Sequence, residues 1–341
     1  MDLNNILQRF GLENYSVRSF GNGLINTTWI ADKNEKQFIL QKINHNVFAS
    51  PEDINYNVTH LANFLQHHHP GYLFISPIKA LDGNGLVKTN EGYFRIFPFV
   101  KKSHSIDVVQ NPVQAYEAAK QFGKFTKVLS GFDAAGLKIT LPHFHDLSFR
   151  YRQFKEALQN GNKERIQQSK DIIHFIQEQK NIVDMYEKIR SDPEFKIRVT
   201  HHDTKISNVL FDEHDKGICV IDLDTVMPGY FISDVGDMMR TCLSPVNEEE
   251  KDFLKIEIRK DFYEAIVNGY LSEMRDELTE TEKLYFIYAG KFMIYMQAMR
   301  FITDHLNNDI YYGAKYEAHN YVRAQNQITL LQRLLAIEKD L

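Results

Sequence analysis

The sequence predicts an α+β fold of two lobes, a small antiparallel sheet with one helix followed by a larger, mostly helical part. Residues 17 to 100 contain short β-branched and aromatic runs between turn signals, which is the pattern of antiparallel strands. After residue 100, apolar residues recur at three-and-four spacing, which indicates helices, and one strand-like segment interrupts them between about 197 and 222. We therefore expect an N-lobe over residues 1–100 and a C-lobe over residues 101–341.

The N-lobe strands are expected where the β-branched and aromatic runs lie, within residues 16–23, 26–43, 74–89 and 92–100. Turn signals at residues 32–34 and 82–85 separate them. The one helix is expected to begin at Pro51, because proline is favoured in a first helical turn and Ser50 precedes it. Ile54, Val58 and Leu61 then follow at helical spacing.

The C-lobe helices are expected where apolar residues have helical spacing, at 112–130, 146–160, 164–190, 248–275, 280–306 and 318–338. The most apolar long stretch, residues 284–306, also contains Lys291, Gln297, Arg300 and Asp304. Polar residues at this density argue against a membrane span and for a buried helix.

Composition is that of an ordinary soluble protein, with 43% hydrophobic and 25% charged residues. The net charge of −5 gives no footprint for nucleic acid or for an acidic membrane surface. Cys219 and Cys242 are the only cysteines, too few for a disulfide framework or a thiolate metal site. The N-terminus has no basic patch followed by an apolar run, so we expect a cytoplasmic protein rather than a secreted one.

Chemistry concentrates in the segment around residues 201–224. A short strand at 209–211, a turn at 212–217 and a second strand at 218–221 would form a hairpin that holds Asn208 and Asp222 at one end, near Asp203. Phosphoryl transfer needs a carboxylate to take the acceptor's proton and oxygen ligands to hold Mg²⁺. Asp203 is then the predicted base, Asn208 and Asp222 the predicted metal ligands, and His201 a brace for the loop.

Two neighbours of these residues are left open. Asp224 is either a second metal contact or a turn-former, and nothing in the sequence fixes the role of His202. A zinc site built from His201, His202 and His214 competes for the same segment, but adjacent histidines on a strand point to opposite faces. The run His67-His68-His69 follows an amphipathic helix and is interpreted as a polar helix end.

The order and spacing of these residues resemble the aminoglycoside phosphotransferase and choline kinase superfamily of protein-kinase-like small-molecule kinases. His201-x-Asp203-x4-Asn208 resembles its catalytic loop, and Ile221-Asp222 its metal-binding segment. Residues 234–237 resemble the acidic start of the helix that follows. The resemblance implies a protein-kinase-like bilobal fold that uses ATP and Mg²⁺.

The donor side of that resemblance lies in the N-lobe. Gly21, Gly23, Asn26 and Thr27 resemble a turn that covers the nucleotide phosphates, where glycine permits close backbone approach. Lys42 is the candidate cation for those phosphates, although strand alternation leaves open whether Gln41 or Lys42 faces them. The backbone around Pro98 and Val100 is expected to face adenine.

One branch of the superfamily, the N-acetylhexosamine 1-kinases, is similar over nearly the whole chain, at residues 25–27, 40–44, 222–229, 300–306 and 309–312. This similarity implies transfer of phosphate to the anomeric hydroxyl of an N-acetylhexosamine. Arg300, Asp304 and Tyr311 would then contact the sugar. The preferred hexosamine, the nucleotide preference and the oligomeric state are left open, and no protein partner is implied.

Alternatives remain within and outside kinases. Another small alcohol, such as choline, homoserine, a ketosamine or an aminoglycoside, could be the acceptor. A nucleotide-binding pseudokinase or partner-binding module is a different class, but the presence of Asp203, Asn208 and Asp222 together argues against it. A metal hydrolase would require zinc and no ATP.

Overall fold

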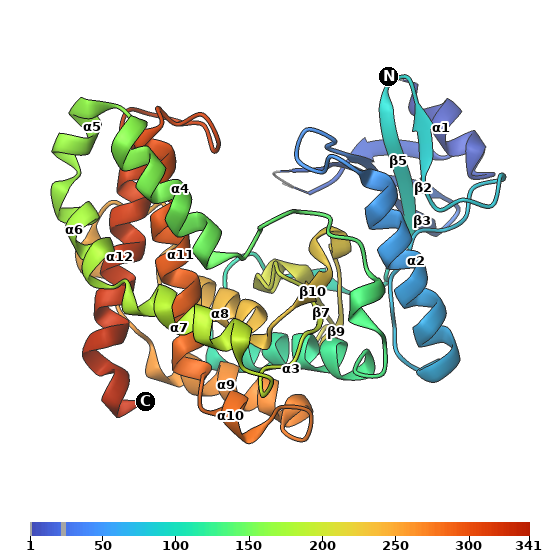
Figure 1. The fold of residues 1–341 in the computed structure, drawn as a ribbon. Coiled ribbons are helices and arrows are strands. Elements are labelled where there is room, and N and C mark those ends of the chain that lie inside the picture. Colours follow the sequence, from blue (N-terminus) through green and yellow to red (C-terminus); the bar gives the residue numbers. More distant parts are fainter. Residues whose placement is uncertain (1, 22–24) are drawn as a thin grey trace.

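The computed structural model describes residues 2–21 and 25–341, and it confirms the α+β fold. The N-terminal part is a five-stranded sheet whose strands run in the order β1-β2-β3-β5-β4 with antiparallel neighbours (Figure 1). These strands are β1 (Ser16–Ser19), β2 (Thr27–Lys33), β3 (Lys36–Ile43), β4 (Val87–Thr89) and β5 (Gly92–Pro98). Of the predicted strand segment 74–89, only the last three residues form a strand.

The β2–β3 hairpin closes through a two-residue turn. Lys33 pairs with Lys36, and both residues between them have positive φ, 46° at Asn34 and 65° at Glu35. Such a turn has the twist of the flanking strands and therefore fixes their register. On its other edge, β3 pairs with β5, and there Gln41 lies opposite Arg95 and Lys42 opposite Phe94.

Two helices accompany the sheet, where the sequence predicted one. The additional helix, α1 (Leu3–Arg9), has seven residues, too few for a periodic pattern to be recognised. Asp2 caps it by accepting hydrogen bonds from the backbone nitrogens of Asn4 and Asn5. Its buried Ile6 and Leu7 pack in a core that the sheet shares, together with Trp29, Leu40, Phe94 and Ile96.

The predicted helix, α2 (Pro51–His68), packs mainly against the helical part of the molecule. Its buried Ile54, Val58 and Leu61 belong to the large core that runs through the C-terminal helices. The fully buried Asn57 donates hydrogen bonds to the carbonyls of Lys138 at 2.9 Å and Val226 at 3.0 Å. Chain order therefore places α2 in the N-lobe, whereas its packing ties it to the C-lobe.

The C-terminal part is mostly helical (Figure 1). Its helices are α3 (Pro112–Val128), α4 (Leu147–Asn160), α5 (Lys163–Gln168), α6 (Lys170–Glu178), α7 (Asn181–Ser191), α8 (Phe231–Cys242), α9 (Lys260–Met274), α10 (Glu280–Lys283), α11 (Phe286–Leu306) and α12 (His319–Ile337). The predicted helix 164–190 is divided into three, and the predicted helix 248–275 begins only at residue 260. Among the helices of the described residues, none is long and apolar enough to cross a membrane.

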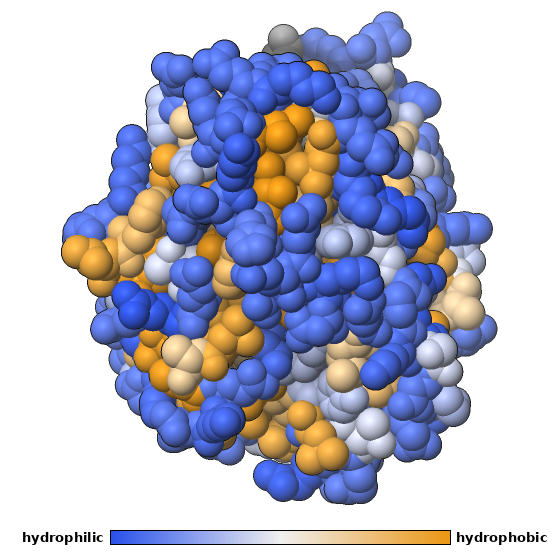
Figure 2. Space-filling model, turned by 60° about the vertical axis from the view of Figure 1, so that its left-hand side comes forward, coloured by the Kyte–Doolittle hydropathy of each residue, from blue (hydrophilic) through white to orange (hydrophobic). Residues whose placement is uncertain are grey.

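Short strands lie between the large sheet and the helices in Figure 1. They are β6 (His104–Ser105), β7 (Arg198–Thr200), β8 (Val209–Phe211), β9 (Gly217–Val220) and β10 (Met227–Gly229). The predicted hairpin is present as β8 and β9, in which Val209 pairs with Val220. One view of the surface is mostly hydrophilic, with hydrophobic side chains gathered in a recess near its upper edge (Figure 2).

Candidate active site

The β8–β9 hairpin brings the predicted catalytic loop and metal segment together. The backbone nitrogen of Ile221 donates to the carbonyl of Asn208 at 2.9 Å, and His201 Nε2 donates to the carbonyl of Ile221 at 2.9 Å. The side-chain nitrogen of Asn208 donates to the carbonyl of Asp203 at 2.8 Å, which directs its amide oxygen away from that carbonyl. His201 is fully buried, and burial lowers the pKa of its ring.

The start of α8 holds the catalytic loop in place. Asp234 accepts hydrogen bonds from the backbone nitrogens of His201 at 3.0 Å and His202 at 2.8 Å. Asp237, one turn later, accepts from the nitrogen of Thr204 at 2.9 Å. Burial raises the pKa of Asp234 to about 7 although both hydrogen bonds lower it. These two carboxylates therefore orient the loop and are not free to react.

Asp203 has a cation beside it that the sequence reasoning missed. Lys205 Nζ lies 3.1 Å from a carboxylate oxygen of Asp203, whose side chain keeps 18% of its surface exposed. Burial lowers the pKa of Lys205, but the charges of Asp203 and Asp237 outweigh burial and the net shift is upward. Lys205 is thus a protonated ammonium at neutral pH. The sequence could have indicated this cation, because Lys205 lies inside the motif His201-x-Asp203-x4-Asn208, two residues after Asp203.

Asp222 has the surroundings of a metal ligand. Desolvation by the surrounding protein, followed by the charges of Asp224 and Asp203, raises its pKa to about 7. Within the described residues, no cation forms an ion pair with Asp222. The side chain of Asp222 is exposed to solvent and therefore accessible to an ion. A carboxylate next to other carboxylates is stabilised by a divalent cation, and with the amide oxygen of Asn208 it offers the hard oxygen ligands that Mg²⁺ prefers. These residues therefore fit the predicted metal.

The carboxylate of Asp224 contacts two residues of the sheet region. Arg95 Nη1 lies 2.6 Å from one oxygen, and the side-chain nitrogen of Asn26 donates to the other at 2.8 Å. The side chains of Arg95 and Asp224 are only 4% and 2% exposed. Asp224 therefore joins the sheet to the catalytic segment through a buried ion pair, and its metal contact stays a prediction.

Lys42, the candidate cation for the donor phosphates, lies on β3. It shares one face of β3 with Leu40 and lies over the ring of Phe94, and both of these belong to the core under α1. Gln41, on the opposite face, accepts two hydrogen bonds from Arg95 at 3.1 and 2.9 Å. The cation on the face toward the catalytic segment is thus Arg95. Strand alternation could have indicated it, since Arg95 lies between the fully buried Phe94 and Ile96.

The remaining donor-side residues are placed as follows. Gly21 has a φ of 72°, which favours glycine, whereas Gly23 lies outside the described residues. Asn26 uses both ends of its amide, accepting from the Asn44 nitrogen at 3.0 Å and donating to Asp224, so its side chain links the sheet to the metal segment. Thr27 is exposed at the start of β2.

The segment after β5 offers limited backbone groups to a base. Pro98 has no N–H, and the Phe99 nitrogen donates to the carbonyl of Gln37 at 3.2 Å. The hydroxyl of Ser103 donates to the carbonyl of Val100 at 2.7 Å. The carbonyl of Pro98 and the nitrogen of Val100 are therefore the groups that fit the predicted adenine contact.

Comparison with known proteins gives the family. Residues 16–280 match the model of the phosphotransferase enzyme family. The chain belongs to this family. It is therefore a small-molecule phosphotransferase of the aminoglycoside phosphotransferase and choline kinase group, as the catalytic loop predicted.

Solved structures with the same fold include three kinases of different acceptors. A microcompartment-associated aminopropanol kinase is 16% identical to this chain, with a TM-score of 0.69. The match covers 99% of this chain and 97% of the aminopropanol kinase. A spectinomycin phosphotransferase with ADP and spectinomycin is 15% identical, with coverages of 99% and 98% and a TM-score of 0.62. A choline kinase from Streptococcus pneumoniae is 13% identical, with coverages of 97% and 97% and a TM-score of 0.55. Identities this low show the shared fold alone.

The predicted sugar contacts lie at the end of α11 and in the segment after it. We call this region, around Arg300, Asp304 and Tyr311, the acceptor side. The carboxylate of Asp304 accepts from the backbone nitrogens of Tyr311 at 2.7 Å and Tyr312 at 2.9 Å and from Asn320 at 3.1 Å. It therefore shapes the 311–312 segment instead of presenting a free carboxylate. Arg300 contacts Gln297 and the hydroxyl of Tyr311, both at 3.4 Å.

A pair of histidines joins this side to the catalytic loop. His202 Nδ1 lies 3.2 Å from Nδ1 of His145, which immediately precedes the Asp146 cap of α4. Burial lowers the pKa of His202 to about 4 and that of His145 well below its usual range. Both rings are therefore neutral at pH 7, and the hydrogen bond between them has one donor and one acceptor nitrogen. The sequence left the role of His202 open, and in the structure its ring contacts the buried ring of His145.

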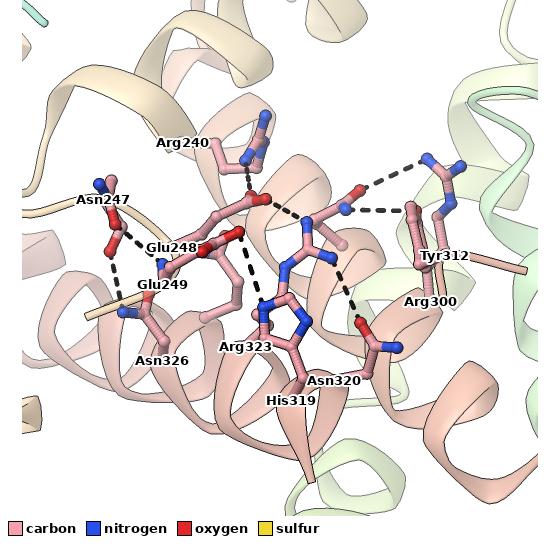
Figure 3. Close-up of polar contacts among 12 residues, drawn as sticks. Arg240, Asn247, Glu248, Glu249, Arg300, Tyr312, His319, Asn320, Arg323 and Asn326 are labelled. Carbon is pink, nitrogen blue, oxygen red and sulfur yellow. Dashed lines mark hydrogen bonds and ion pairs between the residues drawn. The ribbon is translucent and has the colours of Figure 1, made fainter. Parts of the chain in front are cut away.

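An ionic network connects α8 with the acceptor side (Figure 3). Arg240, which binds Asp237 at 2.9 Å, also binds Glu248 at 2.8 Å. The other oxygen of Glu248 binds Arg323 on α12, and Arg323 donates to Asn320 at 3.2 Å. Since Asn320 also binds Asp304, the anchor of the catalytic loop and the 311–312 segment share one set of contacts.

Proposed function

We propose that this phosphotransferase transfers the γ-phosphoryl group of ATP to the anomeric hydroxyl of an N-acetylhexosamine. The nucleotide part is supported by the related spectinomycin phosphotransferase structures, which contain ADP in one case and AMP in another. The anomeric sugar part is supported by the sequence similarity to N-acetylhexosamine 1-kinases over nearly the whole chain. The acceptor side of the structure supplies the observation that favours a sugar over a cationic alcohol.

That observation is the position of Arg300. Its guanidinium lies among three aromatic rings, 5.4 Å from Phe144, 5.9 Å from Tyr311 and 5.5 Å from Tyr312. Aromatic rings in such a group can bind a ligand's ammonium, but here a side chain of the protein provides the cation. Choline and aminopropanol carry a positive charge, so Arg300 would repel them, whereas its fork of donors suits hydroxyl and acetamido oxygens.

The reaction is a direct in-line transfer. A bond forms between the anomeric oxygen and the γ-phosphorus while the bond from that phosphorus to the bridging oxygen of ADP breaks. The proton of the anomeric hydroxyl passes to the carboxylate of Asp203. Lys205, at 3.1 Å from that carboxylate, provides positive charge next to the group being transferred.

Residues of the hairpin and the sheet would position the donor. Asn208 and Asp222 would hold Mg²⁺, which when bound neutralises negative charge on the donor phosphates. Gly21 permits close approach of the backbone in the covering turn. Arg95 keeps Asp224 in place between the sheet and the metal segment.

The test is an ADP-release assay with ATP and Mg²⁺ over N-acetylglucosamine, N-acetylgalactosamine, glucose, choline, aminopropanol and homoserine. We expect turnover on an N-acetylhexosamine, an anomeric phosphate by phosphorus NMR, and loss of both in Asp203→Asn. Turnover only on choline or aminopropanol would disprove the sugar acceptor and keep the kinase. ATP binding without ADP release on any acceptor would favour the pseudokinase alternative.

A further inference from the structure

A polar hollow lies between the start of α4 and the end of α11. Its volume is about 120 Å³, and it is lined by Arg150, Gln153, Arg300, Thr303, Asp304, Asn307, Tyr311 and Tyr312. Two of these residues are arginines, and the only carboxylate among them is that of Asp304. Because two arginines face one carboxylate, the lining of the hollow carries an excess of positive charge, and the carboxylate of Asp304 already accepts hydrogen bonds from the backbone of residues 311 and 312.

Neither arginine has a carboxylate within ion-pair distance among the described residues. Arg150 donates to the side-chain oxygen of Gln153 at 2.9 Å and to the carbonyl of Phe144 at 3.4 Å, and Arg300 has only the contacts described above. Burial and the charge of Arg300 lower the pKa of Arg150 to about 10, so both guanidiniums remain charged at neutral pH. Two like charges side by side without an anion are a costly arrangement.

Two polar atoms of the hollow's lining residues also lack a partner in the described structure. Arg150 Nε and Thr303 Oγ1 are both buried and make no hydrogen bond. An unsatisfied buried donor costs about 1 to 3 kcal/mol, so such atoms are usually paired by protein, water or ligand. Donors that belong to residues around one hollow, together with two unpaired positive charges, indicate a ligand with several acceptor oxygens.

We propose that this hollow binds an oxyanion, namely a phosphate, sulfate or carboxylate group, held by Arg150, Arg300 and Thr303. Guanidinium forks bind such groups with two parallel hydrogen bonds, and a hydroxyl adds a third. The anion is either a substituent of the acceptor or a free ion. If the anion is a substituent, the inference rests on the proposed function and narrows the acceptor to a hexosamine with an anionic group away from C1. If the anion is a free ion, the inference does not depend on the proposed function.

The place of the hollow fits the acceptor side. Phe144 packs under the guanidinium of Arg300, and the next residue, His145, contacts His202 beside the predicted base Asp203. A sugar with its anomeric hydroxyl at Asp203 would therefore extend toward the hollow with its far end. A substituent on C6 is the chemically simplest way to place an anion there.

Titration calorimetry without Mg²⁺ tests the site by binding alone. The probes are inorganic phosphate, N-acetylglucosamine and N-acetylglucosamine 6-phosphate. The variants are Arg150→Gln and Thr303→Val, with Arg152→Gln as the matched control, because Arg152 lies on the same helix and is exposed. Circular dichroism melting checks that each variant is folded.

We expect a phosphate-bearing probe to bind the parent chain and Arg152→Gln equally, and to bind Arg150→Gln at least tenfold more weakly. Thr303→Val should weaken binding several-fold. Tighter binding of the 6-phosphate than of the plain sugar, lost in Arg150→Gln, assigns the anion to the acceptor. Binding of phosphate with no advantage for the 6-phosphate assigns a free ion.

Equal binding by the parent and a folded Arg150→Gln would place the anion elsewhere, at the nucleotide side for example, and would overturn the proposal. So would failure of both phosphate-bearing probes to bind the parent. Neither result concerns turnover. The sugar kinase proposal could therefore fail in the ADP-release assay while the oxyanion site stands, or the reverse.

Discussion

Asp203 is the residue on which the proposed chemistry depends. Asp203→Asn keeps the size of the side chain but removes the base, so kcat should fall by about 10² to 10⁴. The melting temperature should stay close to that of the parent, because within the described structure Asp203 makes a single ion pair, with the exposed Lys205. Steady-state kinetics with calorimetric measurement of nucleotide binding check this. Glu213→Gln, an exposed carboxylate on the same hairpin, is the control and should be fully active.

Asp222 makes stability depend on pH in an unusual direction. Its pKa is raised to about 7 by desolvation, then by Asp224 and Asp203, from an ordinary value near 4. The folded state therefore favours the protonated form. Its contribution to stability is full at pH 4 and is lost as the pH rises through about 7. Without Mg²⁺, stability should fall over this range.

Asp222→Asn removes that charge and tests the argument. At pH 8 without Mg²⁺ the variant should be more stable than the parent, and it should be inactive. Mg²⁺ should stabilise the parent more at pH 8 than at pH 6, and should not stabilise the variant. Urea unfolding at both pH values measures this. Equal stability of parent and variant at pH 8 would contradict the raised pKa.

Residues adjacent in the chain were the ones the sequence could identify. Asp203, Asn208 and Asp222 flank one hairpin, so turn signals alone bring them together. Arg95 and Arg150 lie far from that hairpin in the chain, and only the strand register and the packing of α4 bring them to the site. The occupied carboxylates of Asp224 and Asp304 were equally hidden, because their partners are distant or are backbone atoms.

At the scale of elements, the sheet places a positive charge next to the metal segment through Arg95 on β5 rather than through Lys42 on β3. Arg95→Gln breaks a buried pair and leaves Asp224 uncompensated, which should cost about 3 to 5 kcal/mol and raise the KM for ATP. Lys42→Gln is the matched comparison on the neighbouring strand and should change both quantities little. Thermal unfolding and ATP kinetics of the two variants check the assignment. A larger ATP defect in Lys42→Gln would restore the sequence-based prediction.

The network between α8 and α12 predicts an effect on the acceptor. Burial raises the pKa of Glu248, but Arg240 and then Arg323 outweigh burial and keep the carboxyl ionised. Glu248→Gln removes the charge between the two arginines and loosens Asn320, which helps to hold Asp304. The acceptor KM should rise several-fold, while the KM for ATP should change less than twofold.

Glu249 supplies the control for that measurement. It is adjacent in the chain and pairs with Lys315 at the surface, so Glu249→Gln should leave both KM values unchanged. Equal effects of the two substitutions on acceptor and ATP would show a general loss of structure instead of the expected coupling.

Elements were predictable where their pattern was long. The helices α2, α3 and α11 have enough turns for apolar spacing to show, whereas α1 has seven residues and α10 has four. The segment 74–86 has a strand-like composition, but most of it makes no strand pairing, because its apolar residues pack against the cores. The residue types of this segment predict that its side chains are buried. Whether its backbone pairs with a strand depends on neighbouring segments that the sequence does not reveal.

For the whole molecule, packing and chain order divide the structure differently. A boundary near residue 100 follows the chain from sheet to helices, and it remains a prediction. The small core under the sheet includes Trp29 and α1, but α2 packs in the large core of the C-terminal helices. Asp224 is bound by Arg95 and Asn26 of the sheet region, which adds a buried polar link between the two parts. The two parts should therefore unfold together.

Trp29 makes this measurable, because it is the single tryptophan and lies 8% exposed in the sheet's own core. In urea, its fluorescence should change with the same midpoint as the far-ultraviolet circular dichroism, which reports mainly the C-terminal helices. Asn57→Ala removes the buried amide that bonds α2 to Lys138 and Val226. It should lower the free energy of unfolding by about 1 to 3 kcal/mol, and the urea midpoint should fall by the same amount for both probes. If Trp29 became exposed at lower urea than the helices melt, the sheet would be an independent unit and the inter-lobe contacts would be weaker than their burial implies.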